Sequence, residues 1–330
     1  MGSELIEAVR PSWLPGLVAV PRITIAGFAP LVRMQRYQIH SRIETGKVAL
    51  HFSDVNEPVA ALAYDLNRFA SATFETVASM TRAAKLPKSA AWLCVQAYYG
   101  AYYAAHALVR SLGRTYSRLD QQDVRALNEI VDLFGMSNGS PLPVATYSGH
   151  LGHATRSFEI SRAPDSRGGA SHSGFWHFFL LEVRALQSRI LTGSGLASQN
   201  QRAALKLHEL CESLCREGYN HGAWLSAVRN EISYRHQRGC WYPYGYRRQD
   251  ADRLYNVLPG WKQDTYSFDL NRNRRPELID FLTTCVFLIA LCRELVESIV
   301  DRRTVRHVFL EGGCIRLLCL MTQTDLASAG

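Results

Sequence analysis

One short segment of the chain joins two residue types that can act together on a phosphate. Arg229 and His236 are separated by six residues, in a segment whose pattern predicts a helix over residues 221–238. Seven residues turn an α-helix by about 700°, so the two side chains are expected within roughly 20° of each other. A guanidinium holds phosphate oxygens, and an imidazole with a reference pKa of about 6.5 moves a proton near neutral pH. The pair therefore suits phosphodiester chemistry without a metal.

Two features around this pair strengthen the interpretation. Asn230 directly follows Arg229 and can orient either group or a substrate. A second helix is predicted from Cys94 to Gly113, and small residues on it allow another helix to approach closely. One stripe of that helix carries polar side chains at helical spacing, namely Tyr99, Tyr103, His106 and Arg110.

These residues resemble the HEPN superfamily, helical domains best known as metal-independent ribonucleases. The family signature is an arginine followed, after four to six residues, by a histidine, often with a polar residue next to the arginine. Arg229-Asn230 through His236 is similar to that signature, and the helix from Ala97 to His106 looks like a second recurring family element. The resemblance covers about residues 55–302 and implies a HEPN-like helical bundle.

The resemblance also implies a reaction and partners. Members of the family usually form homodimers in which two such helices share one cleft, and no metal or other cofactor takes part. The ribose 2′-hydroxyl attacks the adjacent phosphate, which leaves a 2′,3′-cyclic phosphate and a 5′-hydroxyl. Arg229 and His236 are then the expected catalytic residues with Asn230 in support, and Tyr99, Tyr103 and His106 are expected to lie behind them.

The family resemblance further suggests a biological setting. Related nucleases act as growth-arresting toxins or anti-phage effectors that cut tRNA or mRNA. Their partner proteins include an antitoxin, a nucleotidyltransferase or an ATPase.

A basic, aromatic segment follows the arginine–histidine helix. Five arginines and one glutamate lie between residues 229 and 248. Exposed aromatic rings stack on unpaired bases and arginines neutralise phosphates, so this segment is a candidate RNA-binding surface. Its candidate residues are Arg235, Arg238, Trp241, Tyr244, Arg247 and Arg248. In the alternative interpretation, the aromatic rings cap the hydrophobic core and bind nothing.

Helical periodicity predicts the elements that must position these residues. Apolar residues recur at helical spacing over residues 60–85, 87–112, 121–134, 175–191, 199–216 and 276–303. We therefore expect a mainly α fold with three parts: a β-rich N-terminal extension over residues 1–54, a helical domain over 55–303, and a β-like tail over 304–330. Residues 113–174 are expected to form a long loop or insertion, because their second half is rich in Gly, Ser, Pro and His.

Composition bounds the remaining possibilities. The 330 residues are 47% hydrophobic and 20% charged, which excludes a disordered chain, and the net charge of +8 favours anionic partners such as RNA. Eight cysteines without a Cys-x-x-Cys pair, no secretory signal and no apolar run long enough for a membrane predict a cytoplasmic protein. His208, Cys211 and Cys215 share a helix face but have no fourth ligand at a standard spacing, so no metal is expected.

Two other classes of function remain open from the sequence. The chain can be a non-catalytic HEPN-like subunit that binds RNA or a protein within a larger defence or regulatory complex. It can also be a purely structural helical protein whose basic surface is incidental, since an arginine and a histidine on a helix commonly form only a solvated face.

Overall fold

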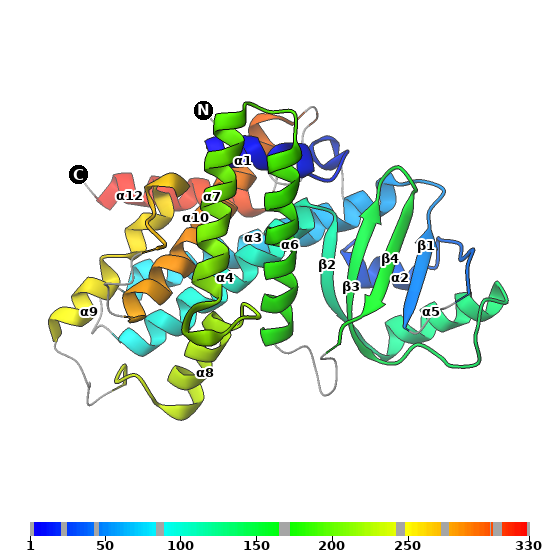
Figure 1. The fold of residues 1–330 in the computed structure, drawn as a ribbon, viewed down its shortest axis with the longest axis horizontal. Helices are drawn as coiled ribbons and strands as arrows, with labels where there is room; N and C mark the ends of the chain where they lie inside the picture. Colours follow the sequence, from blue (N-terminus) through cyan, green and yellow to red (C-terminus); the bar gives the residue numbers. More distant parts are fainter. Residues whose placement is uncertain are drawn as a thin grey trace.

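A computed structural model describes residues 3–20, 25–42, 46–83, 89–164, 172–241, 248–271, 277–303, 305 and 312–328. The described chain is mainly helical, with a small antiparallel sheet at one end (Figure 1). The α-helices are α1 (Glu4–Val9), α2 (Phe28–Arg33), α3 (Asn56–Ala83), α4 (Ala90–Ser111), α5 (Gln121–Leu133), α6 (His172–Thr192), α7 (Ala197–Leu214), α8 (Trp224–Arg235), α9 (Arg248–Tyr255), α10 (Glu277–Asp301) and α12 (Cys314–Ser328). The strands are β1 (Lys47–His51), β2 (Arg114–Leu119), β3 (Ala145–Gly152) and β4 (Ser157–Arg162).

The helical body is built around α4, which packs against both α3 and α10. The Ser89 hydroxyl accepts a hydrogen bond from the backbone N–H of Trp92 and so caps the start of α4. Gly100 faces α10 so closely that a Cβ atom there would lie 3.0 Å from Cδ1 of Ile289. The close helix approach expected from the small residues of α4 is therefore confirmed.

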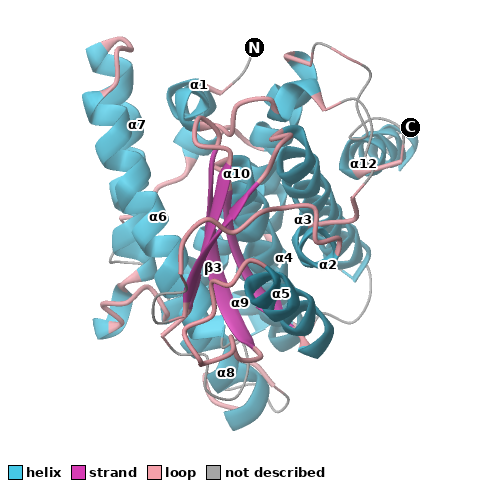
Figure 2. Cartoon of the chain, turned by 90° about the vertical axis from the view of Figure 1, so that its right-hand side faces the viewer, coloured by secondary structure: helices cyan, strands magenta, loops and turns pink. Residues whose placement is uncertain are grey.

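A pair of antiparallel helices, α6 and α7, stands across the front of this body (Figures 1 and 2). The short helix α1 packs against α7, and α8 packs against α4 and α6. The helix that carries Arg229 is therefore held by the same helix that carries Tyr99, as a site built from both requires.

The sheet has the strand order β1-β4-β3-β2, and every neighbouring pair is antiparallel. Helix α2 packs against α5 and β2. The ring of Phe28 in α2 packs on that of Phe158 in β4, with the two centroids 4.8 Å apart. Helix α5 begins with a capping box between Asp120 and Asp123. The sheet thus forms a unit that joins the helical body through α2, α3 and the short link between α4 and β2.

The mainly α class predicted from the sequence is confirmed, but the β-rich ends are wrong in part. The described part of residues 1–54 holds one strand, β1, while Leu17–Ala19 is a 3₁₀ turn. The predicted β-like tail instead contains α12, which packs on α3. Its start is fixed by Asn67, whose Oδ1 accepts the backbone N–H of Cys314 at 2.9 Å.

The long loop or insertion predicted over residues 113–174 is mostly regular structure. The helix predicted over residues 121–134 is confirmed as α5, but the parts expected to be loop contain β2, β3 and β4, and buried residues alternate along β3. Gly149 lies at the centre of β3, where a Cβ atom would come within 2.6 Å of both Phe158 and Thr115. Tight packing of this kind explains why small residues dominate a stretch whose composition resembles a loop. Among the helices that the structure describes, none combines the length and apolarity needed to cross a bilayer.

Candidate arginine and histidine site

Helix α8 ends earlier than its sequence pattern predicts. Its last residue is Arg235, and His236 has φ +51°, in the left-handed region, where it donates its backbone N–H to the carbonyl of Glu231. Arg238, at φ +67°, also lies in the left-handed region. His236 therefore lies outside the helix, and the prediction that it shares a helix face with Arg229 is wrong. His236 is exposed, whereas Arg229 is only 4% exposed.

The guanidinium of Arg229 is enclosed by aromatic rings and polar oxygens. Nη1 donates to Oδ1 of Asn230 at 2.8 Å and to the Tyr234 hydroxyl at 3.3 Å, and Nη2 donates to the Tyr99 hydroxyl at 3.1 Å. The guanidinium carbon also lies 5.1–5.5 Å from the ring centroids of Tyr98, Tyr99 and Tyr234. The structure thus brings Asn230 and Tyr99 to Arg229.

No carboxylate of the described chain forms an ion pair with Arg229, and its Nε–H lies buried without a hydrogen-bond partner there. Buried charges in proteins are normally paired, since an unpaired charge loses its hydration. Tyr234, which is 73% exposed, contributes the outermost of the three contacts. An anion that displaced Tyr234 would reach a preformed guanidinium.

A second imidazole lies beside Arg229. His172, the first residue of α6, approaches the Tyr98 hydroxyl with Nδ1 at 2.9 Å, and the Trp176 indole N–H donates to that same hydroxyl at 3.0 Å. Tyr98 is then free to donate to Nδ1, which leaves the ring proton on Nε2. Burial and, to a lesser extent, the charge of Arg229 together lower the pKa of His172 to about 4.

His172 was not among the site residues predicted from the sequence. It follows a stretch that reads as a loop, and 74 positions separate it from Tyr98. A signal does exist in the sequence, because Trp176 lies four residues after His172 and both therefore fall on one helix face.

His236 belongs to an exposed aromatic surface. Its ring stacks on that of Trp241, with the two centroids 5.3 Å apart. Trp241 also forms an edge-to-face pair with Trp92, with centroids 5.6 Å apart, and Trp92 is 57% exposed. The indole N–H of Trp241 donates to the carbonyl of Ile232 at 2.7 Å and fixes the ring against α8. Trp241, which was predicted to bind RNA, is therefore half-buried and packs against the core.

The predicted RNA-binding arginines separate into three groups. Arg235 is exposed. Arg238 is instead an ion-pair centre with three carboxylates: Nε donates to Glu231 at 2.6 Å, Nη2 to Glu217 at 3.2 Å, and Nη1 contacts Glu277. Its charge is thus neutralised within the protein. Tyr244 and Arg247 lie outside the described residues, as does the side chain of Arg248, the first residue of α9.

Tyr103 and His106 extend the α4 stripe away from Arg229. Tyr103 packs between Tyr99 and Phe69, at 6.3 and 6.5 Å between ring centroids, and His106 lies on the far side of Phe69. Tyr99 is the member of the stripe that touches Arg229. His106 is joined to the neighbourhood of Arg229 only indirectly, through Tyr102, whose ring centroid lies 4.7 Å from that of His106 and 4.5 Å from that of His172.

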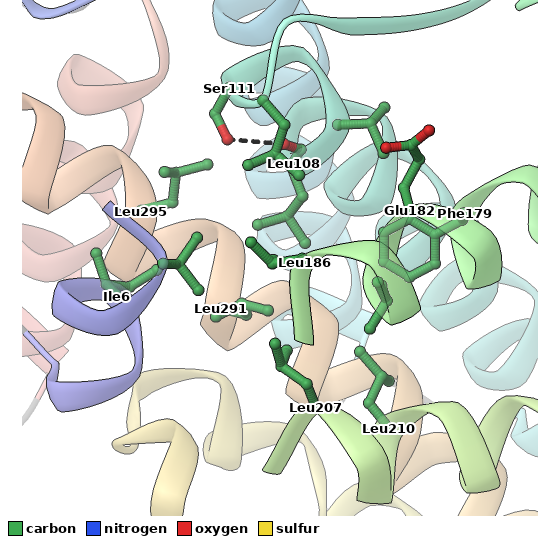
Figure 3. Close-up of a pocket in the computed structure, with 14 residues that line it drawn as sticks. Ile6, Leu108, Ser111, Phe179, Glu182, Leu186, Leu207, Leu210, Leu291 and Leu295 are labelled. Atoms are coloured by element: carbon green, nitrogen blue, oxygen red, sulfur yellow. Dashed lines mark hydrogen bonds between the residues drawn. The ribbon is translucent and has the colours of Figure 1, made fainter. Parts of the chain in front are cut away.

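The described chain holds no cluster of metal ligands. Its histidines, cysteines and carboxylates do not gather in threes as metal ligands do, and Cys211 is buried while His208 is exposed. A cavity of about 30 Å³ between α1, α4, α6, α7 and α10 is lined almost wholly by aliphatic side chains (Figure 3). Ser111 and Glu182 are its polar exceptions, and none of the sequence-predicted site residues lines it.

Comparisons with known proteins add no assignment to this geometry. The chain matches no protein-family model, no curated protein and no solved structure.

Proposed function

We propose that this chain is a metal-independent endoribonuclease of HEPN type. One observation carries the proposal: a buried guanidinium without a carboxylate partner in the described chain, seven residues before an exposed imidazole. A phosphate supplies the anion that this guanidinium lacks, because bidentate contacts from arginine to phosphate oxygens are strong and directional. The resemblance of Arg229-Asn230 through His236 to the family signature supports the same reaction.

The proposed reaction uses the residues as follows. The scissile phosphate displaces the Tyr234 hydroxyl, and Arg229 stabilises the charge that builds on the non-bridging oxygens. His236 accepts the proton of the attacking 2′-hydroxyl or donates one to the departing 5′-oxygen, and the second role falls to another group in the shared cleft. Asn230 holds the guanidinium in its orientation. The products are a 2′,3′-cyclic phosphate and a 5′-hydroxyl.

The surface around His236 provides the proposed RNA contacts. Trp92, Trp241 and Tyr234 offer aromatic faces or edges for unpaired bases, and Arg235 offers an exposed cation for the backbone. We propose tRNA or mRNA as the substrate, a homodimer as the active form, and growth arrest in a toxin–antitoxin or anti-phage role in the cytoplasm. An antitoxin, nucleotidyltransferase or ATPase is the proposed regulatory partner.

The test is cleavage of total tRNA by the purified protein with and without EDTA. Wild-type protein is expected to cut RNA in EDTA, and His236→Ala is expected to lower the rate by about 100-fold or more. Because His236 is exposed, the variant should keep the wild-type melting temperature. A strict requirement for a divalent metal, or full activity of His236→Ala, would contradict the mechanism.

A second candidate function is a non-catalytic RNA- or protein-binding subunit. The burial of Arg229 beneath Tyr98, Tyr99 and Tyr234 favours it, because a buried residue commonly serves the fold. The two candidates differ in one comparison. If Arg235→Ala abolishes RNA binding while wild type and His236→Ala both leave RNA intact, the chain is a binding module.

A further inference from the structure

A pocket of about 520 Å³ lies where α2, α3, α4 and β2 meet. This volume falls within the range of small-molecule sites. Aromatic side chains from all four of these elements line it, among them Phe28 of α2, Tyr64 of α3, Tyr102 of α4 and Tyr116 of β2. Such walls favour a flat ring, because rings stack face to face with an offset or edge to face.

His106 gives this pocket a buried polar group without a partner. The imidazole is stacked between Phe175 at 3.7 Å and Phe69 at 4.7 Å, and the edge of Tyr102 closes a third side at 4.7 Å. His106 lines the pocket, although only 4% of its surface is exposed. Nδ1 has no hydrogen-bond partner among the described residues.

The imidazole is held in its neutral form. Burial lowers the pKa of His106 well below its usual value, and the neighbouring charges of Arg110 and Arg68 oppose protonation as well. A neutral imidazole has one donor and one acceptor nitrogen, so it can hydrogen-bond a ring heteroatom or a substituent on the ring.

Positive charge exceeds negative charge around the pocket. The Asp65 carboxylate forms ion pairs with Arg68 and Arg110, at nitrogen–oxygen distances of 3.0 and 3.5 Å. It also accepts a hydrogen bond from the backbone N–H of Phe28 at 3.3 Å. Arg118 is exposed at the rim, and no ion pair joins it to a carboxylate of the described chain. The pocket and its surroundings thus contain three arginines, Arg68, Arg110 and Arg118, and one aspartate, and this excess of positive charge favours an anionic ligand.

We propose that this pocket binds a small molecule with a planar aromatic ring and one anionic group, a carboxylate or a phosphate. The ring lies among the tyrosines and meets His106, and the anion lies toward Arg68 and Arg118. This site is separate from Arg229 and His236 and does not depend on the nuclease proposal. It also gives His106, one member of the polar stripe of α4, a role that the nuclease reaction does not use.

The test is titration calorimetry of the full chain with phenyl phosphate as the probe. We expect a dissociation constant of about 1 mM or lower. Inorganic phosphate, which lacks the ring, and benzyl alcohol, which lacks the charge, should each bind at least about tenfold more weakly. Arg118→Ala is expected to weaken phenyl phosphate about tenfold, and Arg125→Ala on the exposed face of α5 serves as the matched control and should leave phenyl phosphate binding unchanged.

A second variant tests the imidazole. His106→Phe preserves stacking between Phe69 and Phe175 but removes the ring nitrogens. It should weaken 4-hydroxyphenyl phosphate, whose ring hydroxyl can hydrogen-bond the imidazole, while leaving phenyl phosphate binding and the melting temperature close to wild type. Absence of phenyl phosphate binding at about 10 mM, or equal binding by inorganic phosphate, overturns the proposal. Equal losses in Arg118→Ala and Arg125→Ala overturn it too. Binding that persists in His236→Ala separates this site from the nuclease reaction.

Discussion

The Arg229 side chain illustrates how a charge is kept in the interior without a counter-ion from the residues that the structure describes. Three oxygens and three aromatic rings replace its hydration, and the Tyr99 hydroxyl is the contact from another helix. Tyr99→Phe should lower the free energy of unfolding by about 2 kcal/mol, since it removes a hydrogen bond to a buried cation. Urea denaturation at neutral pH measures this change.

Tyr234→Phe is the matched control, because water can reach a hydroxyl on a residue that is 73% exposed. It should cost less than about 0.5 kcal/mol. If both variants lose the same stability, Tyr99 is not the anchor of the guanidinium.

The neutral His172 ties stability to pH. Its pKa in the folded state is about 4, because burial and the charge of Arg229 disfavour protonation, whereas an unfolded chain has a histidine pKa of about 6.5. The unfolded state therefore binds the extra proton between these two values. Stability should fall as the pH drops through that window and should be fully present above it.

The His172→Asn substitution tests this linkage. The Asn side-chain oxygen can still accept from the Tyr98 hydroxyl, but it does not titrate. The melting temperature of the variant should fall less steeply between pH 6.5 and pH 4.5 than that of wild type, and His208→Asn on the exposed face of α7 should match wild type. A variant profile that follows wild type would assign the acid sensitivity to other groups, of which buried His106 is the first.

Whole elements were predictable where one face of a helix is apolar. Periodicity located α3, α5 and α10 to within a few residues of their observed ends. It failed for the sheet, because β1 pairs with β4 across more than a hundred residues, and close packing at Gly149 demands small residues that read as a loop. It failed at the tail for a related reason, since short apolar runs do not distinguish a strand from a helix.

The candidate site shows the same division. Tyr99, Tyr103 and His106 were expected behind Arg229 and His236, and of these three Tyr99 hydrogen-bonds Arg229. The position of His172 and the left-handed conformation of His236 depend on tertiary contacts that single-helix spacing does not describe.

Arg238 connects three elements at the end of α8. Its carboxylate partners come from α8 itself, from the 3₁₀ turn Arg216–Gly218 and from the start of α10. Arg238→Ala should lower the free energy of unfolding by about 2 kcal/mol, because three carboxylates then repel one another without a cation. Thermal or urea denaturation measures the loss, which high salt should reduce by screening. The exposed Arg235→Ala should change stability by less than about 0.5 kcal/mol, and an equal loss would show that the ion pairs contribute little.

At the scale of the molecule, the two proposed binding regions lie in different parts of the fold. The sheet and α5 lie at one end of the long axis, and α8 lies toward the other side of the helical body (Figure 1). A net charge of +8 acts over the whole surface, so weak attraction for RNA alone does not locate a site. A local site requires that particular cations release counter-ions when RNA binds.

Salt dependence distinguishes a local RNA site from diffuse attraction. For single-stranded RNA, the logarithm of the binding constant falls linearly with the logarithm of salt concentration, with a slope of about −0.7 for each phosphate contact. Arg235→Ala should make this slope shallower by about 0.7 and weaken binding at low salt, because one contact beside His236 is lost. Arg125→Ala removes another exposed arginine, which lies on α5 and pairs with Glu129, and should leave the slope unchanged. Fluorescence anisotropy with a labelled single strand at several salt concentrations provides both slopes. Equal changes in the two variants would mean that RNA meets only the overall positive charge, and the surface around α8 would then have no special part in recognition.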